Sequence, residues 1–222
     1  MTTPALDRPA VLVIDMHRGS IDPPGTVYVP EGRRVVPVLR AFLDAVRPLG
    51  VPVIYLVHQI RPDGLDARNP FWDEARNVAE LYPNVREQVV GSQWTELAAG
   101  LEPVRGDLVL PKKRYGAFSG NELGFLLRNL QVQTLVLTGV ETEICILATA
   151  FHAFNEDYRV VVASDATAGL DPDLAGAALR IIQREVGWVL TCREILAALE
   201  GQGRTAGEGP APAAGGRRKG GA

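Results

Sequence analysis

Thr134-Leu-Val-Leu-Thr-Gly-Val-Glu-Thr-Glu-Ile-Cys145-Ile-Leu-Ala-Thr-Ala150 combines a strand, a tight turn and the start of a helix. The apolar run at 135–137 predicts a buried strand that ends at Gly139. Beyond the turn, apolar residues recur at helical spacing, at Ile144, Leu147, Ala148, Phe151 and Phe154. We expect Thr142 to be the N-cap, because its hydroxyl can accept a backbone N–H of the first turn. This prediction places Cys145 at the third helical position.

Two interpretations of Cys145 stay open on this stretch alone. The positive end of the helix dipole and the unpaired N–H groups of a first turn favour the thiolate, which is the nucleophilic form. Enzymes often present a reactive atom in this way, directly after a strand and a tight turn. Alternatively, a single Cys among Ile and Leu is a small buried apolar side chain with a structural role only.

The composition describes one globular domain with a sizeable core. The chain has 222 residues, of which 46% are hydrophobic and 22% charged. We expect a single domain over residues 1–200 and a disordered tail at 201–222, rich in Gly, Pro and Ala. A net charge of −3 gives no reason to expect nucleic acid or a membrane as partner. Two Cys and the lack of a signal pattern lead us to expect a cytoplasmic protein.

Six short apolar runs predict strands, and helical patterns separate them. The predicted strands lie at 10–14, 52–57, 107–110, 135–137, 159–163 and 187–190. This alternation predicts an α/β fold with a doubly wound parallel sheet in the order 3-2-1-4-5-6, flanked by helices.

Helix starts are marked by local patterns. Capping boxes at 119–122 and 191–194 predict two of them, and the pair Asp171-Pro172 predicts a third. The last helix is expected to end near Leu199. The long segment 59–106 is either a cover over the active site, with one or two short helices, or surface decoration.

Three residues that carry chemistry converge on one edge of the predicted sheet. Asp15 ends the first strand, Lys112 ends the third, and Cys145 follows the fourth. Ligands bind such sheets at the carboxyl ends of the strands where the order reverses. Asp15 would take the thiol proton, and the ammonium of Lys112 would stabilise the thiolate. A Cys–His pair that uses His17, on the same edge, is the alternative mechanism.

The motifs around these residues resemble the isochorismatase-like cysteine hydrolases. They are Val13-Ile-Asp15-Met, Lys112-Lys-Arg-Tyr-Gly-Ala-Phe118 and Thr138-Gly-Val-Glu-Thr-Glu-Ile-Cys145. The family includes N-carbamoylsarcosine amidases, biuret hydrolases and streptothricin hydrolases. The resemblance implies a catalytic triad of Asp15, Lys112 and Cys145. It also implies a cis peptide between Val140 and Glu141, an oxyanion hole formed by the N–H groups of Glu141 and Cys145, and a homo-oligomer, either a dimer or a tetramer.

Departures from the family pattern refine this prediction. His17 stands where Gln is common, and Gly116 stands where Ser is common. Nicotinamidases carry an Asp-x-His-x-His metal site after the second strand, whereas His58 here has no second His nearby. No metal and no cofactor are therefore expected. Family members that cleave the vinyl ether of isochorismate lack the cysteine, so its presence favours hydrolysis of a C–N bond.

The sequence therefore predicts a cysteine hydrolase that cleaves an amide or carbamoyl C–N bond of a small molecule through a thioester. Two alternatives stay open: isochorismate-type ether hydrolysis that does not use the Cys, and a non-catalytic interaction module with a structural Cys. Residues expected to bind substrate are His17, His58, Trp72, Tyr115 and Phe118. Arg61 or Arg114 would either bind a substrate carboxylate or lie on the surface as ordinary charges.

Overall fold

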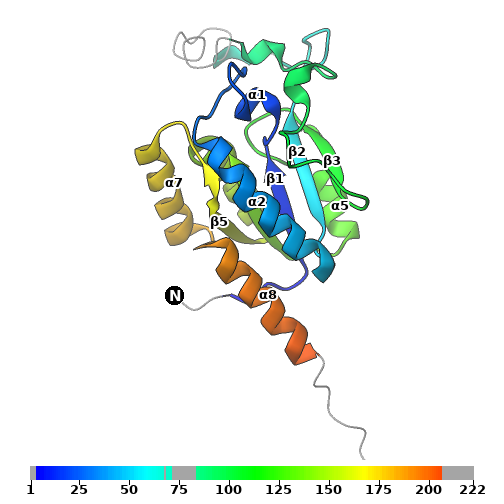
Figure 1. The fold of residues 1–222 in the computed structure, drawn as a ribbon, viewed down its shortest axis with the longest axis vertical. Coiled ribbons are helices and arrows are strands. Elements are labelled where there is room, and N and C mark those ends of the chain that lie inside the picture. The colour runs from blue at the N-terminus through cyan, green and yellow to red at the C-terminus, as the bar shows by residue number, and fades with distance from the viewer. Residues whose placement is uncertain (1–3, 68, 72–83, 207–222) are drawn as a thin grey trace, which may run out of the picture.

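A computed structural model of the chain describes residues 4–67, 69–71 and 84–206 (Figure 1). At its centre is a six-stranded sheet in the order β3-β2-β1-β4-β5-β6, in which all neighbouring strands are parallel. The strands are β1 (Pro9–Ile14), β2 (Val53–His58), β3 (Leu108–Lys112), β4 (Thr134–Val140), β5 (Arg159–Ala168) and β6 (Trp188–Leu190). The predicted fold class and strand order are both confirmed.

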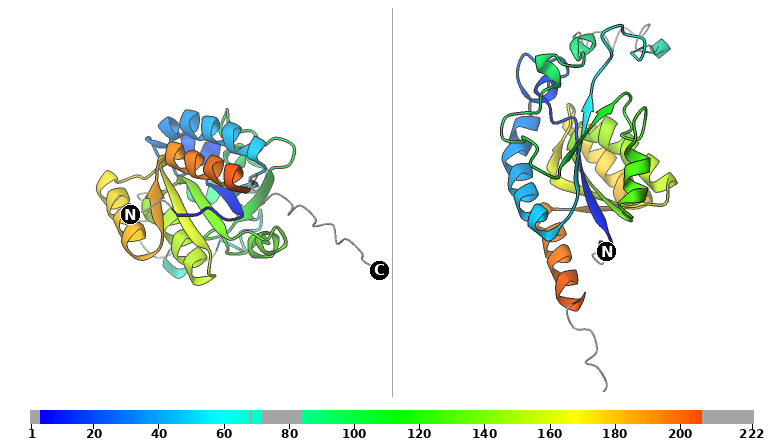
Figure 2. Two further views of the ribbon diagram at one scale, coloured as in Figure 1. Left: turned by 90° about the horizontal axis from the view of Figure 1, so that it is seen from below. Right: turned by 90° about the vertical axis from the view of Figure 1, so that its right-hand side faces the viewer.

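Helices cover both faces of the sheet (Figure 2). One face carries α2 (Gly32–Val46) and α8 (Cys192–Ala206), and the other carries α5 (Leu123–Asn129), α6 (Leu147–Asn155) and α7 (Pro172–Glu185). Side chains of β1 alternate between the two cores: Val11 and Val13 face α2, whereas Leu12 and Ile14 lie in the core with α5 and α6. Burial on both faces explains why the strands are continuous apolar runs. None of the described helices is long and apolar enough to span a membrane.

Strand β4 does not end at Gly139, as the sequence predicted, but continues to Val140. Gly139 has a φ of +106°, and a Cβ at this position would lie 2.0 Å from the carbonyl oxygen of Ile14. Glycine is therefore required where β4 passes β1, and the pairing register with β5 shifts between Leu137 and Gly139. The close approach brings together the two strand ends that carry Asp15 and Cys145.

Two of the three predicted helix starts are confirmed. Asp171 caps α7 by accepting N–H bonds from Asp173 and Leu174. Thr191 and Glu194 form the predicted capping box of α8, each accepting the backbone N–H of the other. The box predicted at 119–122 is wrong because residues 119–122 form turns and α5 begins only at Leu123. There, Asn121 accepts the N–H of Leu123 instead.

The last helix is longer than predicted. Helix α8 continues to Ala206, past the predicted end at Leu199 and into the segment at 201–206 that was expected to be disordered. A Gly inside a helix costs only about 1 kcal/mol relative to Ala, so Gly201 does not end it. Residues 207–222, the rest of the predicted tail, lie outside the described residues.

Residues 59–67 and 84–97 of the segment 59–106 lie at the carboxyl end of the sheet, close to α1 (Arg18–Ile21), and the chain then returns to the other end, where β3 begins (Figure 1). They contain two 3₁₀ turns, η2 (Val85–Glu87) and η3 (Gln93–Thr95). An antiparallel bridge between His17 and Leu97 connects the segment to the residues that follow β1. This position supports a cover over the sheet edge rather than surface decoration.

Candidate active site

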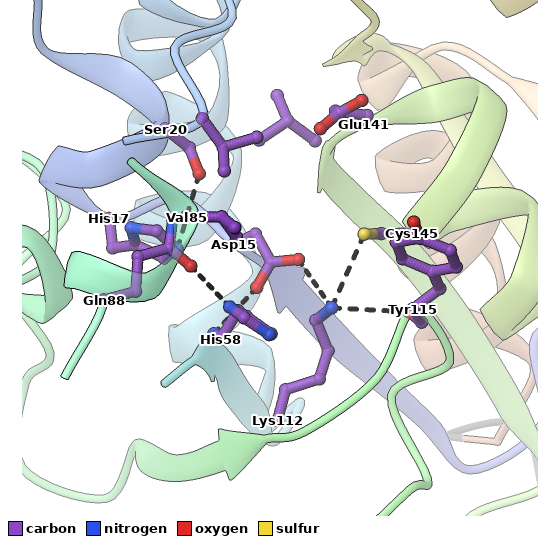
Figure 3. Close-up of a pocket in the computed structure, with 12 residues that line it drawn as sticks. Asp15, His17, Ser20, His58, Val85, Gln88, Lys112, Tyr115, Glu141 and Cys145 are labelled. Atoms are coloured by element: carbon purple, nitrogen blue, oxygen red, sulfur yellow. Dashed lines mark hydrogen bonds and ion pairs between the residues drawn. The ribbon is translucent and has the colours of Figure 1, made fainter. Parts of the chain in front are cut away.

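Asp15, Lys112 and Cys145 meet at the carboxyl edge of the sheet (Figure 3). The ammonium nitrogen Nζ of Lys112 lies 2.8 Å from Oδ2 of Asp15 and 3.5 Å from Sγ of Cys145. β1 and β4 are neighbours in the sheet, and β3 carries Lys112 to the same edge from beyond β2. The structure thus brings together the carboxylate, the ammonium and the thiol that the sequence predicted on this edge.

Asp15 is held at both carboxylate oxygens. Oδ1 accepts the backbone N–H of His58 at 2.9 Å, and Oδ2 pairs with Lys112. Its φ of +53° lies in the left-handed region, which few non-glycine residues adopt. Burial, the largest single effect, would raise the pKa of Asp15, but the neighbouring groups, the Lys112 ammonium foremost among them, together bring the pKa below its usual value. Asp15 is therefore ionised at neutral pH.

Lys112 is almost fully buried, with 1% of its surface exposed. Its ammonium also donates to the carbonyl oxygens of Arg114 at 2.8 Å and Tyr115 at 3.4 Å. Burial would lower the pKa of Lys112, yet the carboxylate of Asp15 raises it above the usual value. The lysine is a fixed, fully hydrogen-bonded cation between Asp15 and Cys145.

Cys145 lies in η4 (Thr142–Ile146), a π-helical turn that leads into α6. The N-cap is Glu141 and not Thr142, because Glu141 is the last residue with extended backbone. The carbonyl of Glu141 accepts the N–H of Ile146 at 3.0 Å, five residues on, which makes the turn π-helical. Cys145 is consequently the fourth residue of the helical segment and not the third. The peptide bond between Val140 and Glu141 is cis.

The thiol of Cys145 is neutral in the resting site, contrary to the thiolate favoured by the helix start. Burial raises the pKa of the thiol, and although Lys112 opposes this effect, the carboxylates of Asp15 and Glu141 raise the pKa further. The positive charge of Lys112 is already balanced by Asp15 at 2.8 Å. A thiolate would add an uncompensated negative charge to a buried site, so the proton stays on sulfur until substrate arrives.

A pocket with a volume of about 50 Å³ opens beside Cys145. Three predicted substrate-binding residues, His17, His58 and Tyr115, line it. Phe118 does not: it stacks on His152 with a centroid separation of 4.6 Å. Trp72 lies outside the described residues. The described residues that line the pocket are Asp15, His17, Ser20, Val27, His58, Val85, Gln88, Lys112, Tyr115, Val140, Glu141 and Cys145.

The two arginines considered for a substrate carboxylate both make contacts within or to the start of the cover segment, of which Arg61 is itself a part. Arg61 pairs with Asp63 at 2.5 Å. Arg114 donates to the carbonyl oxygen of Asp66 at 2.8 Å. Neither arginine is among the described residues that line the pocket. Arg114 helps to hold the cover against the end of β3.

Sequence reasoning missed Ser20 and Gln88 in the pocket wall. Gln88 is buried, contacts Nδ1 of His58 through its amide oxygen and donates to Thr26 at 2.7 Å. It therefore fixes the imidazole of His58, whose backbone in turn holds Asp15. Ser20 lies in α1, 3.4 Å from Nε2 of His17. Neither residue belongs to a pattern that could have marked it, because Ser20 lies in a helix of only four residues and Gln88 lies just after a short 3₁₀ turn.

His17 and His58 are neutral at physiological pH. Burial lowers the pKa of each to about 4, despite the attraction of Asp15 for the charged forms. His17 also lies on the far side of Asp15 from Cys145 (Figure 3). This arrangement favours Asp15 over His17 as the group that receives the thiol proton.

We expect the free energy of unfolding to fall as the pH drops from about 6.5 towards about 4. An unfolded His takes up a proton near the ordinary pKa, whereas buried His17 and His58 do so only near pH 4. The unfolded chain therefore binds more protons across this window, at about 1.4 kcal/mol per histidine for each unit of pKa difference.

Urea unfolding at several pH values measures this slope. His17→Gln should make the slope shallower, because it removes one of the two histidines that stay neutral in the folded protein. An identical slope in the wild type and in His17→Gln would contradict the assignment of a neutral, buried His17.

The similarity to known proteins agrees with this geometry. Residues 9–194 match the Isochorismatase domain family. Ureidoacrylate amidohydrolase RutB of Methylorubrum extorquens is 31% identical over 208 residues, covering 87% of this chain and 83% of the relative. A cysteine hydrolase structure from Pseudomonas syringae pv. phaseolicola has a TM-score of 0.77 at 29% identity, covering 90% of this chain and 99% of that chain. N-carbamoylsarcosine amidase from Thermoplasma acidophilum has a TM-score of 0.68 at 29% identity, covering 83% and 96%.

The family match spans most of the described residues and includes all three strand ends that carry Asp15, Lys112 and Cys145. The relatives share the fold over nearly their whole length, so the likeness is not confined to one motif. The resemblance seen in the sequence is confirmed, and the chain belongs to the isochorismatase family.

Proposed function

We propose that the protein is a cysteine amidohydrolase with Asp15, Lys112 and Cys145 as its catalytic residues. The observation that carries the proposal is the position of the Lys112 ammonium, 2.8 Å from Asp15 and 3.5 Å from the thiol. The predicted class, a hydrolase of C–N bonds other than peptide bonds, is borne out by the similarity to amidohydrolases. The residue roles and the thioester are our proposal.

The first half-reaction forms a C–S bond. Sγ of Cys145 attacks the substrate carbonyl carbon while the thiol proton passes to the carboxylate of Asp15. The charge of the developing oxyanion is stabilised by the backbone N–H groups of Glu141 and Cys145 at the turn after β4. When the tetrahedral intermediate collapses, the C–N bond breaks and Asp15 returns the proton to the leaving nitrogen. A neutral amine or ammonia departs and a thioester remains.

The second half-reaction restores the enzyme. Asp15 removes a proton from water, the resulting hydroxide adds to the thioester carbonyl, and the C–S bond breaks. The proton held by Asp15 then returns to the sulfur of Cys145. Lys112 stays charged throughout, because its raised pKa keeps the proton on nitrogen. It orients Asp15 and balances whichever of the two neighbours carries the negative charge.

The substrate that we propose is a small molecule with a carbamoyl group on nitrogen. The names of two relatives, ureidoacrylate amidohydrolase and N-carbamoylsarcosine amidase, describe such compounds. The pocket of about 50 Å³ accommodates a group of a few non-hydrogen atoms at the reacting centre. Ser20 and Tyr115 also line the pocket and supply polar atoms that are able to orient a urea-like group.

A substrate panel tests this function. Ureidoacrylate, N-carbamoylsarcosine and simple primary amides are incubated with the protein, and released ammonia is measured; isochorismate is included for ether cleavage. We expect ammonia from at least one carbamoyl compound and no loss of isochorismate. Cleavage of isochorismate by Cys145→Ala would favour ether hydrolysis, and no turnover of any compound would favour the interaction module.

We also propose that the protein works in the cytoplasm as a homo-oligomer. Both Cys145 and Cys192 are free thiols, which suits a reducing compartment. Apolar side chains on the outer surface of α5 and α6, among them Phe125 and Phe154, support burial against another subunit. Light scattering of the purified protein measures the subunit number.

A further inference from the structure

Glu143 lies in η4, two residues before Cys145, and is not among the described residues that line the pocket. Its Oε1 accepts two backbone N–H groups from the loop between β5 and α7, those of Leu170 at 2.8 Å and Asp171 at 3.0 Å. The carboxylate therefore joins the turn that holds the thiol to the start of α7. A negative charge here is also favoured by the dipole of this helix.

The fit of this carboxylate is close. A Cβ added at Gly169 would lie 1.9 Å from Oε2 of Glu143, so the loop passes the carboxylate where only glycine leaves room. Oε2 is buried and has no hydrogen-bond partner within the described part of the chain. The tight packing and the two hydrogen bonds from N–H groups restrict the Glu143 side chain to one position. Because the side chain is fixed, the backbone of η4 to which it is attached is fixed as well.

The loop to which Glu143 is bound is itself fixed by the sheet. Thr167 and Ala168 at the end of β5 pair with Gly139 and Val140 at the end of β4. The turn after β4 is thus held at its start by the β4–β5 pairing. Further along, Glu143 holds it to the segment that directly follows β5. The residues between these two points, 141 and 142, lead directly to the thiol.

We propose that Glu143 is a positioning residue that sets the direction of the Cys145 thiol and of the N–H groups at the start of η4. This inference rests on the proposed function for its kinetic consequence but not for its structural one. Glu143 acts through the backbone and does not touch substrate. Losing the two N–H bonds would let the turn shift, and a misplacement of about 1 Å can cost about a hundredfold in rate.

The kinetic test compares three variants on the carbamoyl compound that the wild type turns over fastest. Glu143→Ala should lower kcat by more than about tenfold and leave KM within about twofold, because substrate contacts remain. Glu143→Gln keeps a carbonyl oxygen that can accept both N–H bonds, so it should restore most of the rate. Asp171→Ala is the matched control, since it removes the α7 N-cap but keeps the N–H that Glu143 accepts.

Hydrogen exchange measured by mass spectrometry tests the structural consequence without any substrate. Glu143→Ala should speed exchange in peptides covering 140–147 and 169–172, whereas Asp171→Ala should speed it only at the start of α7. Unchanged exchange at 140–147 in Glu143→Ala would overturn the inference, whatever the protein hydrolyses. So would an equal loss of kcat in Asp171→Ala, which would mean that any loosening of α7 is enough. A wild type that hydrolyses nothing contradicts the proposed function alone.

Discussion

Replacing Cys145 with alanine should abolish hydrolysis, with a loss of at least about 10⁴-fold in kcat. The variant lacks the atom that forms the thioester, and Asp15 and Lys112 cannot supply another nucleophile of comparable strength. The fold should survive, because alanine removes a single sulfur atom from a site that is 7% exposed. Ammonia release and thermal unfolding, measured on the same preparation, separate the two effects.

Cys192→Ala is the matched control for this variant. Cys192 is equally buried and is also a free thiol, but it lies at the start of α8 beside Asp165, away from the pocket. It should keep wild-type kcat. Wild-type activity in Cys145→Ala would mean that the thiol has no chemical role, which is what the ether-hydrolysis alternative predicts.

Replacing Lys112 with methionine should remove both activity and stability. The change leaves the carboxylate of Asp15 buried without its partner, and breaking a buried ion pair in this way costs about 3–5 kcal/mol. The kcat should fall by about 10³-fold, because the cation that balances Asp15 and the sulfur is lost. Urea unfolding and ammonia release measure the two losses.

The pH dependence of this loss has a defined sign. In the wild type the pKa of Asp15 is lowered, so its contribution to stability is present above the unfolded pKa and is lost on acidification through the folded pKa. Without Lys112, burial raises the pKa of Asp15, and the unpaired carboxylate then costs stability at neutral pH. The difference between wild type and Lys112→Met should therefore be largest near neutral pH and shrink as Asp15 protonates.

A double variant and a neighbouring lysine provide the controls. Asp15→Asn with Lys112→Met removes both charges and should regain most of the stability but none of the activity. Lys113→Met breaks a pair with Asp66 at 2.7 Å that is closer to solvent, and should cost about 1 kcal/mol or less. If the double variant were as unstable as Lys112→Met alone, an unpaired Asp15 would not be the cause.

The sequence predicts the sheet well because parallel strands buried on both faces leave a strong signal. The run at 10–14 is apolar at every position, since Val11 and Leu12 face different cores. Asp15 and Lys112 are recognisable as charged residues at the ends of apolar strands. The point at which the strand order reverses then predicts the edge of the sheet where these residues meet. The strand order alone was therefore enough to predict that Asp15, Lys112 and Cys145 lie close together.

What the sequence could not predict depends on contacts between distant segments. Gln88 reaches the pocket only because its segment folds over the sheet and meets His58 and Thr26. Phe118 ends the Lys112 motif in the sequence, yet it stacks on His152 and does not line the pocket. Local patterns carry no information on either contact.

The protonation state of Cys145 was the property that was hardest to predict from the sequence. Its position at a helix start argues for a thiolate, whereas burial and the two carboxylates argue for a thiol. Which effect is larger depends on how deeply the site is enclosed and on whether Lys112 is already paired. Both are properties of the folded protein and cannot be obtained from the spacing of the motifs.

The neutral thiol has a consequence for oxidative damage. Peroxides attack thiolates and react slowly with thiols, so a resting Cys145 should be oxidised to the sulfenic acid only slowly. Cysteine enzymes that keep a permanent thiolate are inactivated in this way whether or not they are working. Here the sulfur becomes vulnerable only while substrate draws its proton towards Asp15, so loss of activity in peroxide should follow the number of turnovers rather than the hours of exposure.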